Sequence, residues 1–191
     1  MTIIYADTKQ NILAEATFVC PSYWMASAFT GSNKKAYHYQ YSVPFASHRS
    51  DVGAYIGPAT VNQGPQFTLA VRSTRLSSLD IGVGTDRTTE IWGNFITQDN
   101  PSIPNTVANG GSSASNPASN WPVWTSANPQ LINLNQTGGV PYQTVFGAAP
   151  ITQYMDPGLT NSFTQANAYT WEADRGQRCD FWKTMGPNVP Q

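Results

Sequence analysis

The amino-acid sequence predicts a single strong β-strand in a chain whose other segments are helical or irregular. Residues 37–43 alternate between tyrosine or valine and polar residues, a period of two that is typical of a strand with one buried face. Pro44 ends the pattern. One strand cannot form a stable sheet by itself, because both edges would leave backbone N–H and C=O groups unpaired. The sequence therefore indicates one piece of a larger sheet.

The hydrophobic periodicity of the remaining chain predicts helices and little further strand. Proline is tolerated in the first turn of a helix, so Pro21 separates a short turn or helix before Cys20 from the helix that follows. A short strand is predicted at 131–134, ended by Gly138-Gly139, and residues 140–168 have the composition of a loop. The predicted helices cover residues 21–29, 51–55, 86–97 and 172–185.

Residues 101–130 are rich in Gly, Ser, Asn and Pro, which predicts a long surface loop. Trp121 and Trp124 interrupt this composition, and we expect their side chains to dock on the core. Residues 72–88 show neither a period nor recognisable turn residues.

The chain carries few charges, and this excludes several classes of function. Only 11% of its 191 residues are charged, and the formal net charge is −1. No basic stripe exists that could neutralise phosphates, so we expect no nucleic-acid partner. No run approaches the ~20 apolar residues that cross a bilayer, so we expect no membrane span. Residues 1–7 lack the basic and apolar regions of a signal peptide.

The sequence lacks the usual motifs for metals and phosphates. Its two histidines and two cysteines lie far apart, so no metal-ligand spacing occurs. No phosphate-binding loop and no Gly-x-Ser-x-Gly elbow is present. We therefore expect neither a metal nor another cofactor. Asn135-Gln136-Thr137 is a candidate acceptor for N-glycosylation.

The two cysteines allow two interpretations. In a cytosolic protein, Cys20 and Cys179 would be buried, reduced thiols; in a secreted protein, a pair is more often a disulfide. The low charge favours secretion.

The two histidines differ in their expected surroundings. His38 lies within the predicted strand, where it is most simply a satisfied polar residue on a sheet face. His48 lies in a loop a few residues past the strand, where α/β folds place catalytic side chains. Its ordinary pKa near 6.5 suits it to proton transfer. The position of His48 in the sequence does not by itself decide between a catalytic role and no functional role.

Five groups of segments, in the same order along the chain, resemble type-B carboxylesterases, the cholinesterase-like branch of the α/β-hydrolases. The resemblance is greatest to secreted fungal members. In this family the catalytic histidine precedes an acidic residue, an aromatic residue and a glycine, a pattern matched by His48, Asp51, Tyr55 and Gly57. The segments are Cys20-Pro21, residues 35–57, residues 91–102, Trp121-Pro122 with residues 131–135, and Cys179-Asp180-Phe181-Trp182.

The resemblance implies that residues 1–191 form the C-terminal part of an α/β-hydrolase fold. That part contains the last core strand, flanking helices and long loops, with an incomplete sheet. His48 would be the acid–base of a Ser–Glu/Asp–His triad whose serine and acid come earlier in the family's order. The chain lacks the Gly-x-Ser-x-Gly elbow and the oxyanion loop, so we expect it to be inactive alone. Asp51 is most simply a carboxylate at a helix start.

The same resemblance implies an extracellular enzyme that acts on a small-molecule or lipid ester, and it implies a disulfide between Cys20 and Cys179. It gives no indication of the oligomeric state. Residues 72–88 match nothing in the family, and our hypothesis is an insertion or a retained intron.

Two alternatives to the esterase stay open. A cholinesterase-like protein can be a non-catalytic binding protein. A secreted carbohydrate-binding module could use exposed Trp121 and Trp124 as stacking platforms, but one good strand is too few for its β-sandwich.

Overall fold

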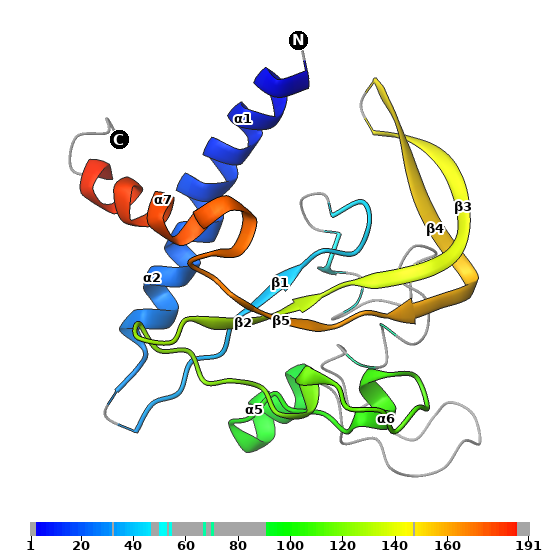
Figure 1. Cartoon of the computed structure of the whole chain (residues 1–191). Helices are drawn as coiled ribbons and strands as arrows, with labels where there is room; N and C mark the ends of the chain where they lie inside the picture. Colours follow the sequence, from blue (N-terminus) through cyan, green and yellow to red (C-terminus); the bar gives the residue numbers. More distant parts are fainter. Residues whose placement is uncertain are drawn as a thin grey trace. The chain divides into compact units, whose positions relative to one another are not determined.

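The computed structural model describes residues 3–31, 33–46, 50–52, 54, 67, 70, 91–146 and 148–186. The chain divides into two compact units. Unit 1 comprises Met1–His38, Pro122–Leu131 and Ala166–Gln191, and unit 2 comprises Tyr39–Trp121 and Ile132–Gln165. Both helices and small open sheets are present, so the protein belongs to the mixed α and β class (Figure 1).

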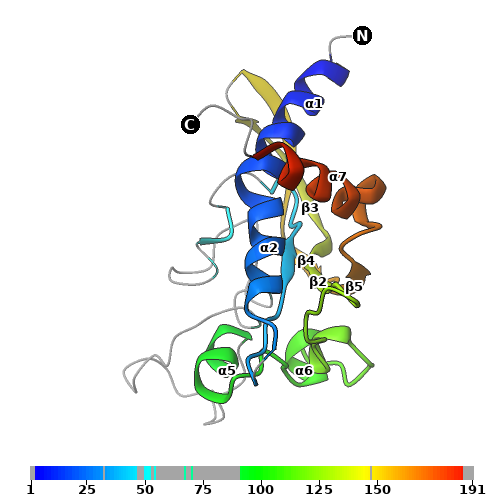
Figure 2. The same cartoon turned by 90° about the vertical axis from the view of Figure 1, so that its left-hand side faces the viewer.

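Unit 1 is built on one long helical rod and a second helix. The rod consists of α1 (Ile3–Ala14), a π-helical turn (Glu15–Val19) and α2 (Cys20–Ala28). Pro21 lies in the first turn of α2, directly after the π-helical turn, in which the Cys20 N–H donates to the C=O of Glu15. The predicted boundary at Cys20 is confirmed, and the break takes the form of a π-turn between two collinear helices (Figure 2).

The second helix of unit 1 is α7 (Trp171–Met185), close to the predicted range. Its regular right-handed part begins after Asp174, because Glu172, Ala173 and Asp174 have positive φ. Together α2, α7 and the segments around Ala36 and Trp124 enclose a core. The buried residues of this core, among them both cysteines, are Cys20, Tyr23, Ala26, Ala36, Trp124, Leu131, Ala168 and Cys179.

A three-stranded sheet has the order β1-β2-β5, formed by β1 (Tyr39–Tyr41), β2 (Gln130–Leu134) and β5 (Thr164–Asn167). β1 and β2 are parallel, with Tyr39 opposite Ile132 and Tyr41 opposite Leu134. Parallel neighbours need a long crossover connection, which the chain from 42 to 129 provides. β1 and β2 confirm the two predicted strands, although β1 is shorter than the predicted range.

The crossover contains α5 (Ile91–Gln98), α6 (Asn105–Ala108) and a 3₁₀-helix (Pro117–Ser119). The predicted helix at 86–97 is confirmed from Ile91 onward, and residues before it lie outside the described part. Residues 72–88 also lie outside it, so the insertion hypothesis stays a prediction.

Within 101–130, irregular chain is interrupted by α6 and the 3₁₀-helix, which a network of asparagine side chains stabilises. Asn116 Oδ1 accepts from the N–H of Ala118 at 2.9 Å, and Asn116 Nδ2 donates to Asn109 Oδ1 at 2.7 Å. Trp121 and Trp124 are buried, 5% and 1% exposed respectively, as docking on the core requires. They offer no exposed stacking surface, so the carbohydrate-binding interpretation based on them is wrong.

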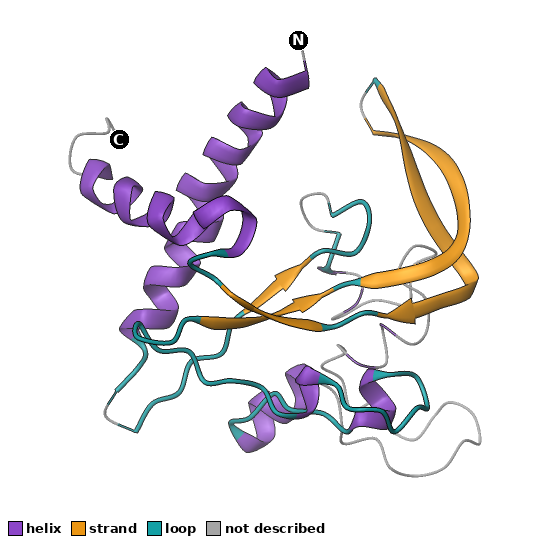
Figure 3. Ribbon diagram, in the orientation of Figure 1, coloured by secondary structure: helices purple, strands orange, loops and turns teal. Residues whose placement is uncertain are grey.

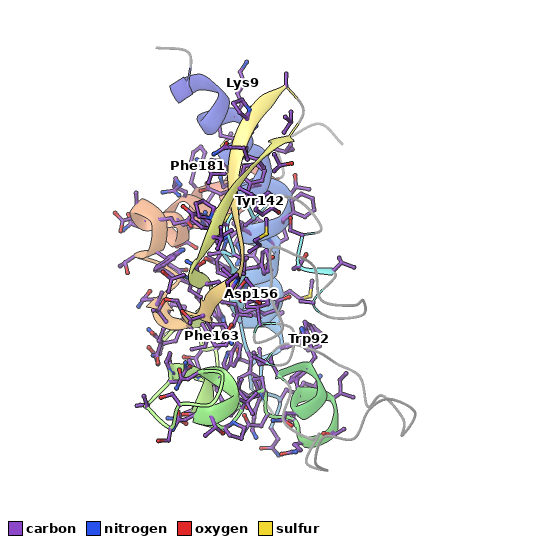
Figure 4. All side chains as sticks on the ribbon, turned by 90° about the vertical axis from the view of Figure 1, so that its right-hand side faces the viewer. Lys9, Trp92, Tyr142, Asp156, Phe163 and Phe181 are labelled. Atoms are coloured by element: carbon purple, nitrogen blue, oxygen red, sulfur yellow. A yellow bond between two sulfur atoms is a disulfide. The ribbon has the colours of Figure 1, made fainter. Side chains whose placement is uncertain are left out.

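Residues 136–161 form a long antiparallel hairpin, which contradicts the predicted loop at 140–168. β3 (Gln136–Phe146) pairs with β4 (Ala149–Asn161), with a register shift between Gly138 and Val140 (Figure 3). Tyr142 on β3 and Asp156 on β4 are labelled in Figure 4. Most of the described hairpin side chains are exposed or half-buried, so the sequence lacks the apolar alternation that marks a strand on a core.

Candidate functional site

The predicted catalytic residue, His48, lies outside the described residues, but the chain on both sides of it is described. The N–H of Ser42 donates to the C=O of Leu134 at 2.9 Å and extends the β1–β2 ladder by one residue. On the far side of His48, the Tyr41 hydroxyl donates to the C=O of Ser50 at 3.5 Å. The described residues Ser42 and Ser50, one on each side of His48, therefore both hydrogen-bond at the β1–β2 pair.

Downstream of this loop, the C=O of Asp51 accepts a hydrogen bond from the N–H of Ala54 at 2.9 Å. This is the first turn of a helical segment, since Val52 and Ala54 are also helical. Asp51 is therefore at the start of a helix, as its interpretation as a helix-start carboxylate requires.

A cavity of about 320 Å³ lies beside the residues that follow β1. Among the described residues, Val43 and Pro44 form one part of its wall, and the base of the β3–β4 hairpin forms another. Gln136 lines it and is only 4% exposed. The Nε2 and Oε1 atoms of its amide are buried and have no hydrogen-bond partner.

His38 is half-buried beside the core of unit 1, with its Nδ1 atom shielded from solvent, and it is not set up for proton transfer. Its Nε2 lies 2.9 Å from Ser22 Oγ, and that hydroxyl donates its only hydrogen to the C=O of Val19 at 2.7 Å. Nε2 must therefore carry the proton and donate it to Ser22, so His38 cannot act as a base toward this serine. Burial lowers the pKa of His38 to about 4.

The His38 ring is held by aromatic contacts, with ring centroids 5.0 Å from Tyr23 and 5.1 Å from Trp124. The Trp124 indole N–H donates to Ser27 Oγ at 3.0 Å. His38 is thus a structural residue within an aromatic cluster, and the strand β1 begins only after it.

A buried carboxylate, which the sequence analysis did not single out, connects the π-turn to α7. Glu15 is 3% exposed. Its Oε1 accepts hydrogen bonds from Arg178 at 2.6 Å (Nη2) and 3.0 Å (Nε), and its Oε2 accepts from the Trp182 indole at 3.3 Å. Arg175 adds a second charge, with its Nε 3.7 Å from Oε1.

Two opposing effects act on the pKa of Glu15. Burial raises it, but the hydrogen bonds from Arg178 and Trp182 and the charges of both arginines outweigh burial, and the net pKa is lowered. The carboxylate is therefore ionised at neutral pH and is occupied by structural partners. Nothing in the local sequence could have revealed this cluster, because Glu15 and Arg178 are 163 positions apart.

The disulfide implied by the resemblance is present. Cys20 and Cys179 are joined, with their Cα atoms 5.0 Å apart, at the start of α2 and in the middle of α7. The bond and the Glu15 cluster both tie the first helical rod to the last helix.

The candidate glycosylation site occupies the junction between β2 and β3. Asn135 is half-buried; its Oδ1 accepts from the N–H of Gln136 at 2.8 Å, and its C=O accepts from the N–H of Ser162 at 2.8 Å. Glycosylation of Asn135 stays a prediction.

Comparison with protein-family models, with curated proteins and with solved structures gave no match to this chain. Among the described residues, no three His, Cys, Asp or Glu side chains come together in a way that could hold a metal ion. None of the helices in the described part of the chain is both long enough and apolar enough to cross a membrane.

Proposed function

We propose that this chain is the histidine-bearing C-terminal part of a secreted serine carboxylesterase, with His48 as its general acid–base. The observation that supports the proposal is the position of the described residues that flank His48. Ser42 and Ser50 both hydrogen-bond at the carboxyl end of β1, a strand in parallel pairing with β2. Loops at the carboxyl ends of parallel strands are where open α/β sheets place their binding and catalytic groups.

The proposed chemistry is acyl transfer from an ester to water. His48 removes the proton of a serine hydroxyl as the serine oxygen attacks the ester carbonyl, and then gives that proton to the departing alcohol. In the second half, His48 takes a proton from water, which attacks the acyl-enzyme and releases the carboxylic acid. An acidic side chain holds the other ring nitrogen and fixes the tautomer.

This chain supplies only one of the three catalytic parts. The serine, the acid and the oxyanion donors belong to the preceding part of the esterase domain. The loss of one oxyanion donor alone typically costs about 10²–10³ in rate. The chain alone is therefore inert, and its substrate in the intact enzyme is a small-molecule or lipid ester.

Two features of unit 1 support the proposal. The disulfide between Cys20 and Cys179 is the pairing that the family resemblance implies, and it suits an extracellular protein. One face of the helical rod exposes large apolar side chains at helical spacing, with Phe18, Met25 and Phe29 each more than half exposed. Such a face is expected of a helix that packs against further parts of a larger domain.

Hydrolysis of p-nitrophenyl acetate tests the proposal. The 191-residue chain should give no rate above buffer, whereas a polypeptide that adds the in-frame upstream sequence should hydrolyse the ester. In that longer protein, His48→Gln should lower kcat at least 10³-fold. His38→Gln is the matched control and should retain activity, because His38 donates to Ser22 inside the core.

Two results would contradict the proposal. The first is hydrolysis by the short chain that His48→Gln leaves unchanged. The second is an upstream sequence without a Gly-x-Ser-x-Gly elbow, which would favour the non-catalytic binding protein instead.

A further inference from the structure

We propose that the cavity at the base of the β3–β4 hairpin binds a small neutral molecule with neighbouring hydroxyl groups, as a sugar or polyol has. This proposal does not rest on the acyl-transfer chemistry. The described lining residues of the cavity belong to unit 2 and come from two places in the sequence, the segment after β1 and the strands of the hairpin.

The described lining residues are uncharged, which favours a neutral ligand. Their side chains are apolar at Val43, Pro44 and Leu159 and polar at Thr137 and Tyr154. Asp156 is the only charged residue of the hairpin, and it is not among them. An ion that entered would lose its hydration without gaining an opposite charge from these residues.

The buried amide of Gln136 identifies the hydrogen-bonding chemistry. Both its Nε2 and its Oε1 lack partners, which is costly for a group that is 4% exposed. The amide presents a donor next to an acceptor, and two neighbouring hydroxyls match that pair because each can donate or accept. Both amide atoms are shielded from solvent, so binding requires the amide to turn toward the ligand, and the last torsion of glutamine is broad enough to permit that turn.

The cavity wall near Gln136 is formed by backbone that cannot easily shift. Gly138 and Gly139 have φ of +75° and +82°, at the register shift of the hairpin. A Cβ on Gly138 would lie 2.5 Å from the C=O oxygen of Gly158, and one on Gly139 would lie 2.8 Å from that of Met155. The strands therefore approach as closely as glycine permits, and the wall is preformed rather than shaped by mobile side chains.

The size and the apolar lining favour one ring over a flexible chain. The volume of about 320 Å³ lies at the lower end of the ~300–1,000 Å³ typical of ligand pockets. Tyr154 is 37% exposed and lines the cavity, so its ring can stack on the C–H face of a saturated ring. A sugar ring combines this apolar face with neighbouring hydroxyls.

Ligand-observed saturation-transfer NMR on the whole 191-residue chain tests the site with matched probes. These are trans-cyclohexane-1,2-diol, cyclohexanol, which lacks the second hydroxyl, and the anion cyclohexanecarboxylate. The diol should bind at least tenfold more tightly than cyclohexanol, and the carboxylate should show no transfer. Gln136→Leu should weaken diol binding at least tenfold. The control Gln143→Leu, an exposed glutamine on the same strand outside the cavity, should leave it unchanged.

A second measurement needs no variant. In the wild-type protein, the diol should shift the backbone amide resonances of Gly138 and Gly139 and the side-chain NH₂ resonances of Gln136. Equal binding of the diol and cyclohexanol, retained diol binding in a folded Gln136→Leu variant, or unshifted resonances at these three residues would each overturn the proposal.

Discussion

The buried ring of His38 should make the stability of unit 1 depend on pH well above the range in which carboxylates titrate. Burial lowers the pKa of folded His38 to about 4, whereas an unfolded histidine has a pKa near 6.5. Between these values the unfolded chain binds a proton that the folded protein excludes. The part of the unfolding free energy that depends on the uncharged His38 ring is therefore fully present above pH 6.5 and is lost as the pH falls from 6.5 toward 4.

The size of the effect follows from the two pKa values. Linkage gives a loss of about 2 kcal/mol in unfolding free energy between pH 7.5 and pH 5 for this one residue. The slope cannot exceed about 1.4 kcal/mol per pH unit, because a single proton is involved. Glu15 contributes below this window, because its pKa is lowered and its carboxylate remains ionised at pH 5.

Urea unfolding followed by tryptophan fluorescence, at several pH values from 7.5 to 5, measures this slope. His38→Gln can still donate to Ser22 but does not titrate, so its unfolding free energy should stay nearly constant over the window. His48→Gln, which alters the other of the chain's two histidines, is the matched control and should keep the wild-type slope. NMR titration of the His38 ring should give a pKa near 4.

The argument fails if His38→Gln retains the slope, or if the His38 ring titrates near pH 6.5. The second result would mean that water reaches the ring, in conflict with its place between Tyr23 and Trp124.

Further predictions concern the links within unit 1 and the hairpin. Replacing both Cys20 and Cys179 by alanine should lower the unfolding free energy in urea by up to about 5 kcal/mol, because the bond closes a loop of 159 positions; an unchanged midpoint would contradict this. Glu15→Gln should cost about 2 kcal/mol at pH 7, because Arg178, whose side chain is 41% exposed, loses charge-assisted hydrogen bonds and Arg175 loses a nearby counter-charge; an unchanged unfolding free energy in the same assay would contradict this. Gly139→Ala should lower the thermal unfolding midpoint, because a Cβ there would lie 2.8 Å from Leu159 Cδ2 and the backbone has positive φ. Gly111→Ala, at φ +113° but with no atom within 4 Å, separates conformational strain from the clash and should cost less.

The elements with a regular spacing of aromatic or apolar residues could be predicted from the sequence. The alternation before Pro44 identified β1, and the helical spacing around Pro21 identified α2 and its start. The range of α7 was also close, although the positive φ at Glu172 to Asp174 left no trace in the residue pattern.

The hairpin could not be predicted, because its stability does not come from an apolar face. Its strands pair through uncharged side chains, such as Tyr142 with Gln153 and Gln143 with Thr152, and these give no apolar alternation. Gly138-Gly139 was interpreted as the end of a strand, whereas in the structure it lies at the register shift within one.

The candidate sites divide in the same way. The loop of His48 lies outside the described residues and stays a prediction, made because it directly follows a strand in the sequence. The Glu15 cluster and the cavity of Gln136 depend on contacts between distant segments. Such contacts depend on tertiary packing, which no local pattern records.

Unit 1 is built from three separate segments of the chain, and this has a consequence for folding during synthesis. The last of them, Ala166–Gln191, is made long after the first, Met1–His38. At about 5–20 residues per second, Cys179 follows Cys20 after about 10–30 s, and until then the Cys20 thiol lacks its native partner. When residues 1–191 are expressed by themselves, their two cysteines allow one internal bridge only. In that preparation, the only incorrect disulfide available to Cys20 joins it to another molecule, so mispairing should appear as covalent dimers or mixed disulfides.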